Sequence, residues 1–197
     1  MTEPNYVTEL RRWEGVVPWM YLDIRGYVTI GVGNLVPTVE AACGLPLWNH
    51  AAERRASTAE IVRSFVAVQA MRAGMAAENY RLSPRLEMSA EDIDIMLRQR
   101  IGGEFLPGLA KLFPGFDGFP GPARSALMDM AFNLGLGREA TADHAATGLR
   151  QFSRLRAAVA ARDWARASGE CRRSSSRTER NEWCRRKFLE AAAPAVV

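Results

Sequence analysis

Cysteine and histidine are both scarce in this sequence. The chain of 197 residues has three cysteines, Cys43, Cys171 and Cys184, and an odd number is atypical of a disulfide framework. A Cys171–Cys184 bridge stays open as one pairing, because spacing does not determine connectivity. There is no C-x-x-C motif and no Cys/His cluster, and the two histidines, His50 and His144, stand alone. We therefore predict no metal site.

A targeting segment and long apolar runs are also missing. The first ten residues, "MTEPNYVTEL", have no basic start, no apolar core and no small-residue cleavage site, unlike a signal peptide. No apolar run approaches the roughly 20 residues that cross a bilayer. We expect a soluble protein made in the cytoplasm without membrane insertion. If it acts elsewhere, it depends on release or injection.

The charge balance is mildly basic, with a net charge of +4 and a pI near 9.3. Such a surface suits an anionic partner: nucleic acid, an acidic membrane face or an acidic polymer such as bacterial cell wall. Charge alone favours a solvated surface without a specific partner. The basic stretch "RRSSSRTER" (172–180) is interpreted as a solvated loop, with a phosphate-binding patch as the alternative. Because no helix-turn-helix, RNP or zinc signature accompanies it, we expect no nucleic-acid partner.

The pattern of the first residues changes from helical to extended. Residues 4–13 predict a short helix, with Tyr6, Leu10 and Trp13 on one face. The segment "WMYLDIRGYVTIGVG" (19–33) is rich in aromatic and β-branched residues around "DIRG", which predicts a β-hairpin.

Beyond Pro37 the pattern is helical almost to the end of the chain. The helix signals are Ser57 with Glu60 as a capping box, Ser89 as a cap, a helix between Pro122 and Gly135, a face of Phe152, Leu155 and Val159, and Thr178 as a last cap. We predict a mostly helical α+β fold in a single domain, 1–197. An N-terminal lobe of about 1–60 holds the hairpin sheet, and a larger helical lobe covers about 60–197.

Two acidic residues flank the junction between the first helix and the hairpin. Cleavage of a glycosidic bond needs one carboxylic acid that protonates the leaving oxygen and a second carboxylate that activates water or stabilises positive charge. Glu14 is suited to the donor role, because its neighbours Trp13, Val16, Val17 and Trp19 predict the apolar setting that favours a protonated acid.

Asp23 is suited to the second role, since Arg25 lies nearby and favours its charged form. The returning strand brings Thr29 toward Asp23, where a hydroxyl can hold the attacking water. Each residue taken singly has a structural explanation: a helix-terminal acid, an Asx-turn residue and a plain β-former. The combination is more informative than its members.

The glycines of "GVGN" (31–34) do not predict a nucleotide site. The third glycine of G-x-G-x-x-G is replaced by Val36, and no parallel βαβ pattern follows. Close approach of the backbone to other backbone or to a ligand is the better interpretation.

The chain resembles a known family at two places. Glu14, eight residues, Asp23, five residues and Thr29, within "EG…YLDIRGYVTIGVGN", are similar to the catalytic block of the T4 lysozyme-like, phage-type muramidases. "ARSALMDMAFNLG" (123–135) is similar to the R-x-A-L-x-x-M-x-F-N-x-G helix of those enzymes. Arg180–Asn181 shows a weaker similarity to the same family. The resemblance covers about a quarter of the chain.

The resemblance implies a lysozyme-like fold and hydrolysis of the β-1,4 bond between N-acetylmuramic acid and N-acetylglucosamine in peptidoglycan. Glu14 would be the general acid, and Asp23 with Thr29 would activate water. An inverting mechanism would place the two carboxyl groups roughly 6.5–9.5 Å apart. It implies no metal or organic cofactor and a monomer whose partner is the cell wall.

The substrate-binding residues are less specific. We expect Tyr21, Gly33, Asn34 and Asn133 to contribute, with packing of the hairpin as the alternative role of Tyr21. The position that matches Asn133 lies near the lobe junction in relatives. Its alternative role is to cap the helix before Gly135.

The chain also departs from the family. Asn34 stands where the family often has His, and the segment 35–87, which would include the wall of the substrate groove, does not align with the family. The same pattern recurs in lysozyme-like toxins injected into rival bacteria, which would add an immunity protein or a secretion-system component as partners. A phage endolysin, an antibacterial effector and a non-catalytic peptidoglycan-binding module all stay open.

Overall fold

The computed structural model describes residues 4–174 and 176–193 and shows the mostly helical α+β fold that the sequence predicts. The chain divides into two compact units. The hairpin unit comprises Glu14–Gln99, and the helical unit combines the N-terminal helix with the chain from Arg100 onward. The chain passes between the units at the end of α1 (Tyr6–Glu14) and near the end of α4 (Ala90–Arg100).

These bounds differ from the predicted lobes, which meet near residue 60. The first helix belongs to the helical unit because its apolar face packs there: the rings of Trp13 and Trp183 are 6.0 Å apart, and Ser125 donates a hydrogen bond of 3.0 Å to Glu9. In the hairpin unit, α3 (Thr58–Gln69) packs against the first sheet, so this unit extends well past residue 60.

The predicted hairpin is confirmed. Strands β1 (Val17–Leu22), β2 (Val28–Gly31) and β3 (Asn34–Leu35) form an antiparallel sheet in that order. The "DIRG" turn joins β1 to β2 through a hydrogen bond from the Gly26 N–H to the Asp23 carbonyl oxygen (3.0 Å). Apolar side chains from both strands and from α3 form the core of this unit: Met20, Leu22, Val28, Ile30, Ile61 and Phe65.

A second sheet corrects the expectation of helix beyond Pro37. It contains β4 (Trp48–Asn49), β5 (Arg54–Arg55) and β6 (Leu86–Glu87), with β4 between the other two. Asn49 forms the β4–β5 turn, since its side-chain oxygen accepts from the N–H groups of Ala51 and Ala52. Strands of two residues are too short to show a period, so the pattern predicts only the helices around them. Those in this unit are α2 (Val39–Cys43), α3, the 3₁₀ turn η1 (Ala77–Tyr80) and α4.

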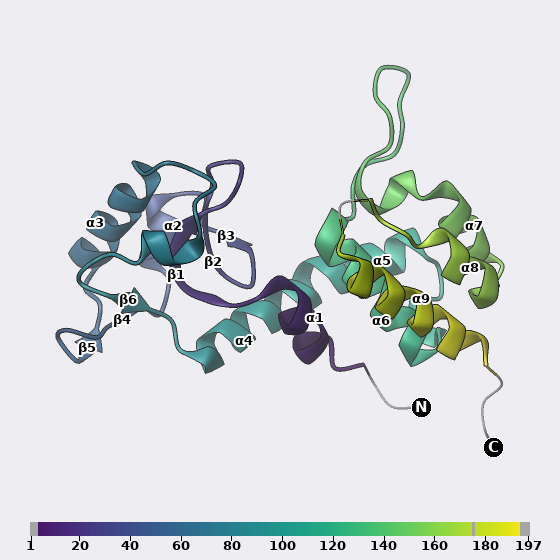
Figure 1. Cartoon of the computed structure of the whole chain (residues 1–197), viewed down its shortest axis with the longest axis horizontal. Coiled ribbons are helices and arrows are strands. Elements are labelled where there is room, and N and C mark those ends of the chain that lie inside the picture. The colour runs from purple at the N-terminus through teal and green to yellow at the C-terminus, as the bar shows by residue number, and fades with distance from the viewer. Residues whose placement is uncertain (1–3, 175, 194–197) are drawn as a thin grey trace. The chain divides into compact units, whose positions relative to one another are not determined.

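The helical unit is built from α1 and from the helices after α4. They are η2 (Ile101–Phe105, a π-helix), α5 (Leu106–Leu112), η3 (Phe116–Gly118), α6 (Gly121–Leu134), η4 (Gly148–Gln151), α7 (Ser153–Ala160), α8 (Trp164–Glu170) and α9 (Thr178–Ala192). α9 packs against both α6 and α8, as Figure 1 shows, and their shared core contains Leu127, Trp164, Ala167 and Phe188.

Most of the predicted helix starts are confirmed. Ser57 and Glu60 form the reciprocal capping box of α3. The Ser89 hydroxyl accepts from the Asp92 N–H at 3.0 Å at the start of α4. The cap at Thr178 is wrong, because Thr178 is already helical and Arg177 occupies the cap position without a side-chain bond.

The interpretation of 172–180 as a solvated loop is wrong for two of its arginines. Arg173 and Arg180 are buried, and each forms an ion pair of 2.8 Å with the buried carboxylate of Asp129 on α6. These guanidinium groups therefore hold the stretch against α6 instead of facing solvent or phosphate. Residue 175 lies outside the described residues.

The Cys171–Cys184 bridge that the spacing left open is not formed. Cys43, Cys171 and Cys184 are free thiols, the last two buried. Each of these two thiols donates a hydrogen bond to a backbone carbonyl oxygen. Cys171 donates to Ser168 at 3.4 Å, and Cys184 donates to Ala126 at 3.9 Å.

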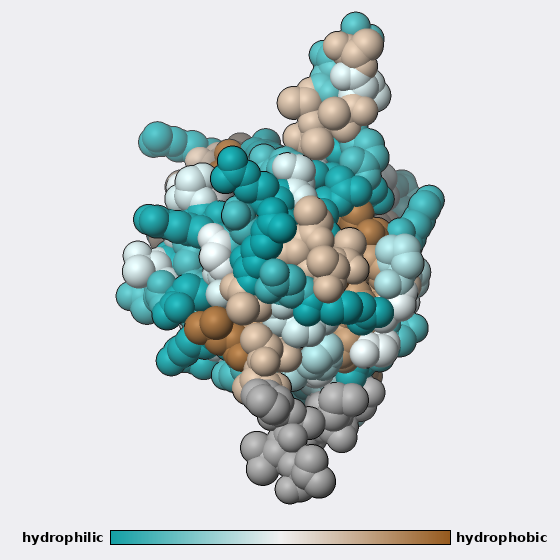
Figure 2. All heavy atoms as spheres, turned by 90° about the vertical axis from the view of Figure 1, so that its right-hand side faces the viewer, coloured by the Kyte–Doolittle hydropathy of each residue, from teal (hydrophilic) through white to brown (hydrophobic). Residues whose placement is uncertain are grey.

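The face shown in Figure 2 is mostly hydrophilic, and its strongly hydrophobic atoms form only small separate groups. Such a face is typical of a water-exposed surface. In the described part of the chain, no helix combines the length and the hydropathy that crossing a membrane requires.

Candidate active site

Glu14 is the last residue of α1 and the first residue of the hairpin unit. Gly15, which follows with a φ of +75°, ends the helix and turns the chain into β1. The side chain of Glu14 is exposed, so the apolar setting predicted from its neighbours is wrong. Those neighbours are themselves only partly buried.

Asp23 lies directly after β1, in the turn of the hairpin. Its Oδ1 accepts from the backbone N–H groups of Arg25 (2.8 Å) and Tyr27 (2.9 Å), which is an Asx-turn arrangement. Arg25, which the sequence predicts to favour the charged form of Asp23, contacts it through its backbone N–H, and its side chain is exposed. Oδ2 has no bonded partner in residues 4–174 and 176–193. One carboxylate oxygen is thus fixed, and the other is available to a water or a substrate.

Thr29 lies on β2 and is buried. Its hydroxyl donates to the Tyr27 carbonyl oxygen at 3.1 Å, and the N–H of Asp23 donates to the same oxygen at 3.0 Å. The hairpin therefore connects Thr29 and Asp23 through one shared acceptor, without a direct bond between their side chains. The oxygen of the Thr29 hydroxyl keeps its lone pairs for a further donor.

Tyr21 is paired with Thr29 across the hairpin and is affected by the charges of Asp23 and Glu14. It pairs with Thr29 across the hairpin, so the two side chains share one face of the sheet. Partial burial raises the pKa of the Tyr21 phenol above 10.0, and the negative charges of Asp23 and then of Glu14 raise it further. Both carboxylates therefore contribute to the electrostatic environment of the same hydroxyl.

Gly33 lies in the turn between β2 and β3, and Asn34 is the first residue of β3. Gly31 and Gly33 have φ values of +67° and +66°, which explains glycine at both positions as backbone geometry. Asn34 is buried, and among the described residues its Nδ2 has no hydrogen-bond partner. A Cβ at Gly31 would lie 3.1 Å from this Nδ2, so glycine also makes room for the amide.

Asn133 belongs to the helical unit, on α6. Its Oδ1 accepts from the hydroxyl of Ser176 at 2.8 Å and lies 3.5 Å from Nη1 of Arg173. The side chain thus joins the ion-pair cluster around Asp129, a contact that neither the groove-facing nor the helix-capping interpretation included. The structure brings Glu14, Tyr21, Asp23 and Thr29 together within one unit, and Asn133 is not part of that group.

The sequence interpretation missed a cluster around Glu87, in the segment that does not align with the family. Glu87 is buried, and its carboxylate forms ion pairs with His50 (3.2 Å), Arg81 (2.9 Å) and Arg85 (3.1 Å). His50 was predicted to stand alone because its partners lie more than thirty residues away and reach it only through the second sheet. No local pattern in the sequence indicates this pairing.

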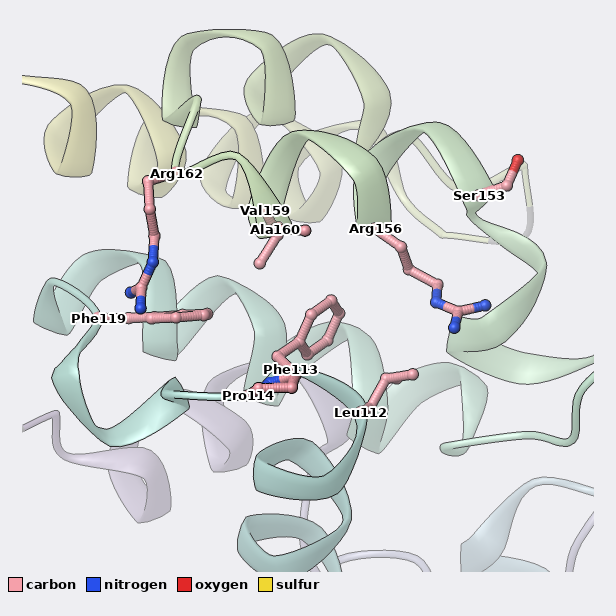
Figure 3. A pocket seen from close by; sticks show the side chains of 9 residues that line it. All are labelled: Leu112, Phe113, Pro114, Phe119, Ser153, Arg156, Val159, Ala160 and Arg162. Carbon is pink, nitrogen blue, oxygen red and sulfur yellow. The ribbon is translucent and has the colours of Figure 1, made fainter.

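The helical unit has a cavity of about 240 Å³ beside α7, with Phe113 and Val159 on its walls (Figure 3). The guanidinium of Arg162 lies 4.1 Å from the centre of the Phe119 ring at one end. None of the residues that line this cavity is acidic, so it supplies no proton donor. The carboxylic groups that acid catalysis needs are found in the hairpin unit, at Glu14 and Asp23.

The described side chains include no group of three or more His, Cys, Asp or Glu that could hold a metal ion. The polar groups near Tyr21 are two carboxylates and a hydroxyl, a set that transfers protons and positions water. Comparison of the chain with models of protein families and with curated proteins finds no match. The geometry of the site therefore has to carry the functional argument.

Proposed function

We propose that this chain is a peptidoglycan muramidase with a lysozyme-like fold. It cleaves the β-1,4 bond between N-acetylmuramic acid and N-acetylglucosamine. It acts on the cell wall in the bacterial periplasm, which it reaches by release or injection. Glu14 is the general acid, and Asp23 with Thr29 activates the attacking water.

The position of Tyr21 carries this proposal. Two carboxylates from different elements, the end of α1 and the turn after β1, both raise the pKa of one phenol. Glycoside hydrolysis needs two carboxylic groups that flank the scissile bond, and in this proposal the sugar lies between Glu14 and Asp23. The resemblance to the catalytic block of the phage-type muramidases assigns the same two acids independently.

In the proposed reaction each group has a separate task. The proton of Glu14 passes to the glycosidic oxygen as the bond to the anomeric carbon breaks. The free Oδ2 of Asp23 accepts a proton from a water that attacks the opposite face of that carbon. The hydroxyl of Thr29 donates to or accepts from the same water. A bound glycan covers Glu14 and supplies the apolar contact that this exposed side chain otherwise lacks.

Release of reducing ends from purified peptidoglycan tests the proposal. The parent chain should produce them, and Glu14→Gln should lower the rate by at least about 10²-fold, the contribution of a positioned acid. Glu78→Gln, which changes an exposed acid of the same unit, is the matched control and should retain full activity. Full activity of Glu14→Gln would overturn the assignment.

A peptidoglycan-binding module without catalysis is the second candidate, and the exposure of Glu14 favours it. A proton donor normally sits in an apolar environment, which this residue does not have. Long incubation followed by muropeptide analysis separates the two. A binding module retains the protein on the wall and produces no new reducing ends.

A further inference from the structure

The segment that does not align with the muramidase family forms a pocket of its own. A cavity of about 460 Å³ lies in the hairpin unit, against the second sheet and the first turn of α4, and Trp48, His50, Arg55, Glu87 and Asp92 are among its lining residues. This volume is within the roughly 300–1,000 Å³ of ligand-binding pockets. The pocket is distinct from the group around Tyr21, because none of the four residues of that group lines it.

An exposed aromatic residue stands at the centre of the sheet face beside this pocket. Trp48 on β4 pairs directly with Arg55 on β5 and with Glu87 on β6, so the three side chains form a row on one face. Trp48 keeps 41% of its surface exposed, which is unusual for the largest apolar side chain. A broad ring face is thus presented to the pocket between a cation and an anion.

The polar groups of the pocket are held in place. His50 and two arginines surround the Glu87 carboxylate, and the Ser89 hydroxyl donates to Asp92 at 2.7 Å. Arg55 differs, since its guanidinium has no acidic partner among the described residues. The pocket therefore offers fixed hydrogen-bonding groups and one available positive charge.

The pocket is joined to the strand that leads through the candidate active site. Met88, another of its lining residues, donates its backbone N–H to the carbonyl oxygen of Pro18 at 2.8 Å. Pro18 lies on β1, between Glu14 and Asp23. The pocket and the group around Tyr21 therefore belong to the same unit and are connected through this hydrogen bond to β1. A chain-like substrate bound at Tyr21 can extend toward the pocket within that unit.

We propose that the Trp48 pocket is a second glycan-binding site, which takes a sugar ring of the peptidoglycan strand on the face of Trp48 and, where the strand carries no peptide, the free lactyl carboxylate of N-acetylmuramic acid on Arg55. The apolar C–H face of a pyranose matches the electron-rich ring face, and its hydroxyl and N-acetyl groups match Asp92 and Ser89. The exposed guanidinium of Arg55, which has no acidic partner among the described residues, selects the acidic sugar, because a guanidinium binds a carboxylate with directional, charge-assisted hydrogen bonds. The identity of the glycan rests on the proposed function, but the site itself does not.

Calorimetric titration of the full chain carrying Glu14→Gln tests this site without hydrolysis. The two probes are a peptide-free hexasaccharide of alternating N-acetylglucosamine and N-acetylmuramic acid, and the N-acetylglucosamine hexasaccharide, which has no carboxylate. Trp48→Ala, introduced into the Glu14→Gln chain, should raise the Kd for both probes at least about tenfold. Trp48→Phe in the same chain should change the Kd by no more than about threefold. Arg55→Gln should raise the Kd for the acidic probe alone.

Val66→Ala is the matched control, since Val66 is an exposed apolar residue of the same unit that does not line the pocket. If Trp48→Ala binds both probes as tightly as Val66→Ala does, the second site is wrong. If Arg55→Gln weakens both probes equally, the selection by charge is wrong. Loss of binding in Trp48→Ala with no release of reducing ends by the parent chain would overturn the muramidase proposal and leave this site standing.

Discussion

Tyr21 lies directly opposite Thr29 across the β1–β2 hairpin. The pair places an aromatic ring and a buried hydroxyl on one face, and the turn that joins their strands contains Asp23. Since Glu14 and Asp23 both act on the pKa of Tyr21, this one cross-strand pair relates all four residues of the candidate site. The Thr29 hydroxyl can be tested through activity, and the Tyr21 phenol through its pKa.

The Thr29 hydroxyl is required for activity and dispensable for folding in our proposal. Thr29→Val keeps the shape of the side chain, and the Tyr27 carbonyl oxygen retains the N–H of Asp23 as a donor. The loss of stability should be about 1 kcal/mol, the typical worth of one hydrogen bond. Reducing-end release should fall at least about tenfold in Thr29→Val and persist in Thr29→Ser. Equal activity of the two variants would remove Thr29 from the mechanism.

The pKa of Tyr21 reports the distance to both carboxylates without any assay of activity. Asp23→Asn and Glu14→Gln should each lower this pKa, with the larger effect from Asp23, because each removes a negative charge that favours the protonated phenol. Titration of the Tyr21 ring carbon by NMR measures it. An unchanged pKa in both variants would contradict the proposed grouping.

The same shift has a consequence for stability at alkaline pH. The phenol holds its proton more tightly in the folded than in the unfolded chain, so this stabilising contribution is present below pH 10 and is lost as the pH rises through the folded pKa. Tyr21→Phe should show a smaller decline of unfolding free energy above pH 10 than the parent chain. Urea unfolding at a series of pH values provides the comparison.

Local signals explain what the sequence predicts correctly. The first helix, the hairpin and the caps at Ser57 and Ser89 are each set by residues within a few positions of one another. The backbone role of Gly31 and Gly33 follows from the same kind of short-range geometry. These features need no knowledge of the rest of the chain.

Long-range contacts explain what the sequence does not predict. The second sheet depends on β6 reaching β4 over more than thirty residues, and the burial of Arg173 depends on Asp129, 44 residues away. The exposure of Glu14 is not determined by the apolar character of its neighbours in the sequence. The second sheet and the burial of Arg173 thus depend on residues that are distant in sequence.

The ion-pair cluster of Asp129 makes the helical unit sensitive to one substitution. Asp129→Asn removes the charge that two buried guanidinium groups share, and the free energy of unfolding should fall by about 3–5 kcal/mol. Glu182→Gln breaks an exposed pair with Arg185 and should change it by less than about 0.5 kcal/mol. Urea unfolding followed by circular dichroism measures both. A loss below about 1 kcal/mol in Asp129→Asn would show that the cluster is not a stabilising element.

The three thiols should differ sharply in reactivity. Cys43 is half-buried at the end of α2, whereas Cys171 and Cys184 are enclosed in the helical unit. A hydrogen bond with Cys171 raises the pKa of the Cys184 thiol, and burial raises it further, which keeps it in the unreactive thiol form. A disulfide reagent such as Ellman's should therefore titrate one thiol in the native chain and three after denaturation. Cys43→Ser should abolish the native reaction and leave two thiols in the denatured chain. Rapid reaction of all three native thiols would contradict the packing around α9, and fewer than three after denaturation without reductant would show that the Cys171–Cys184 bridge forms after all.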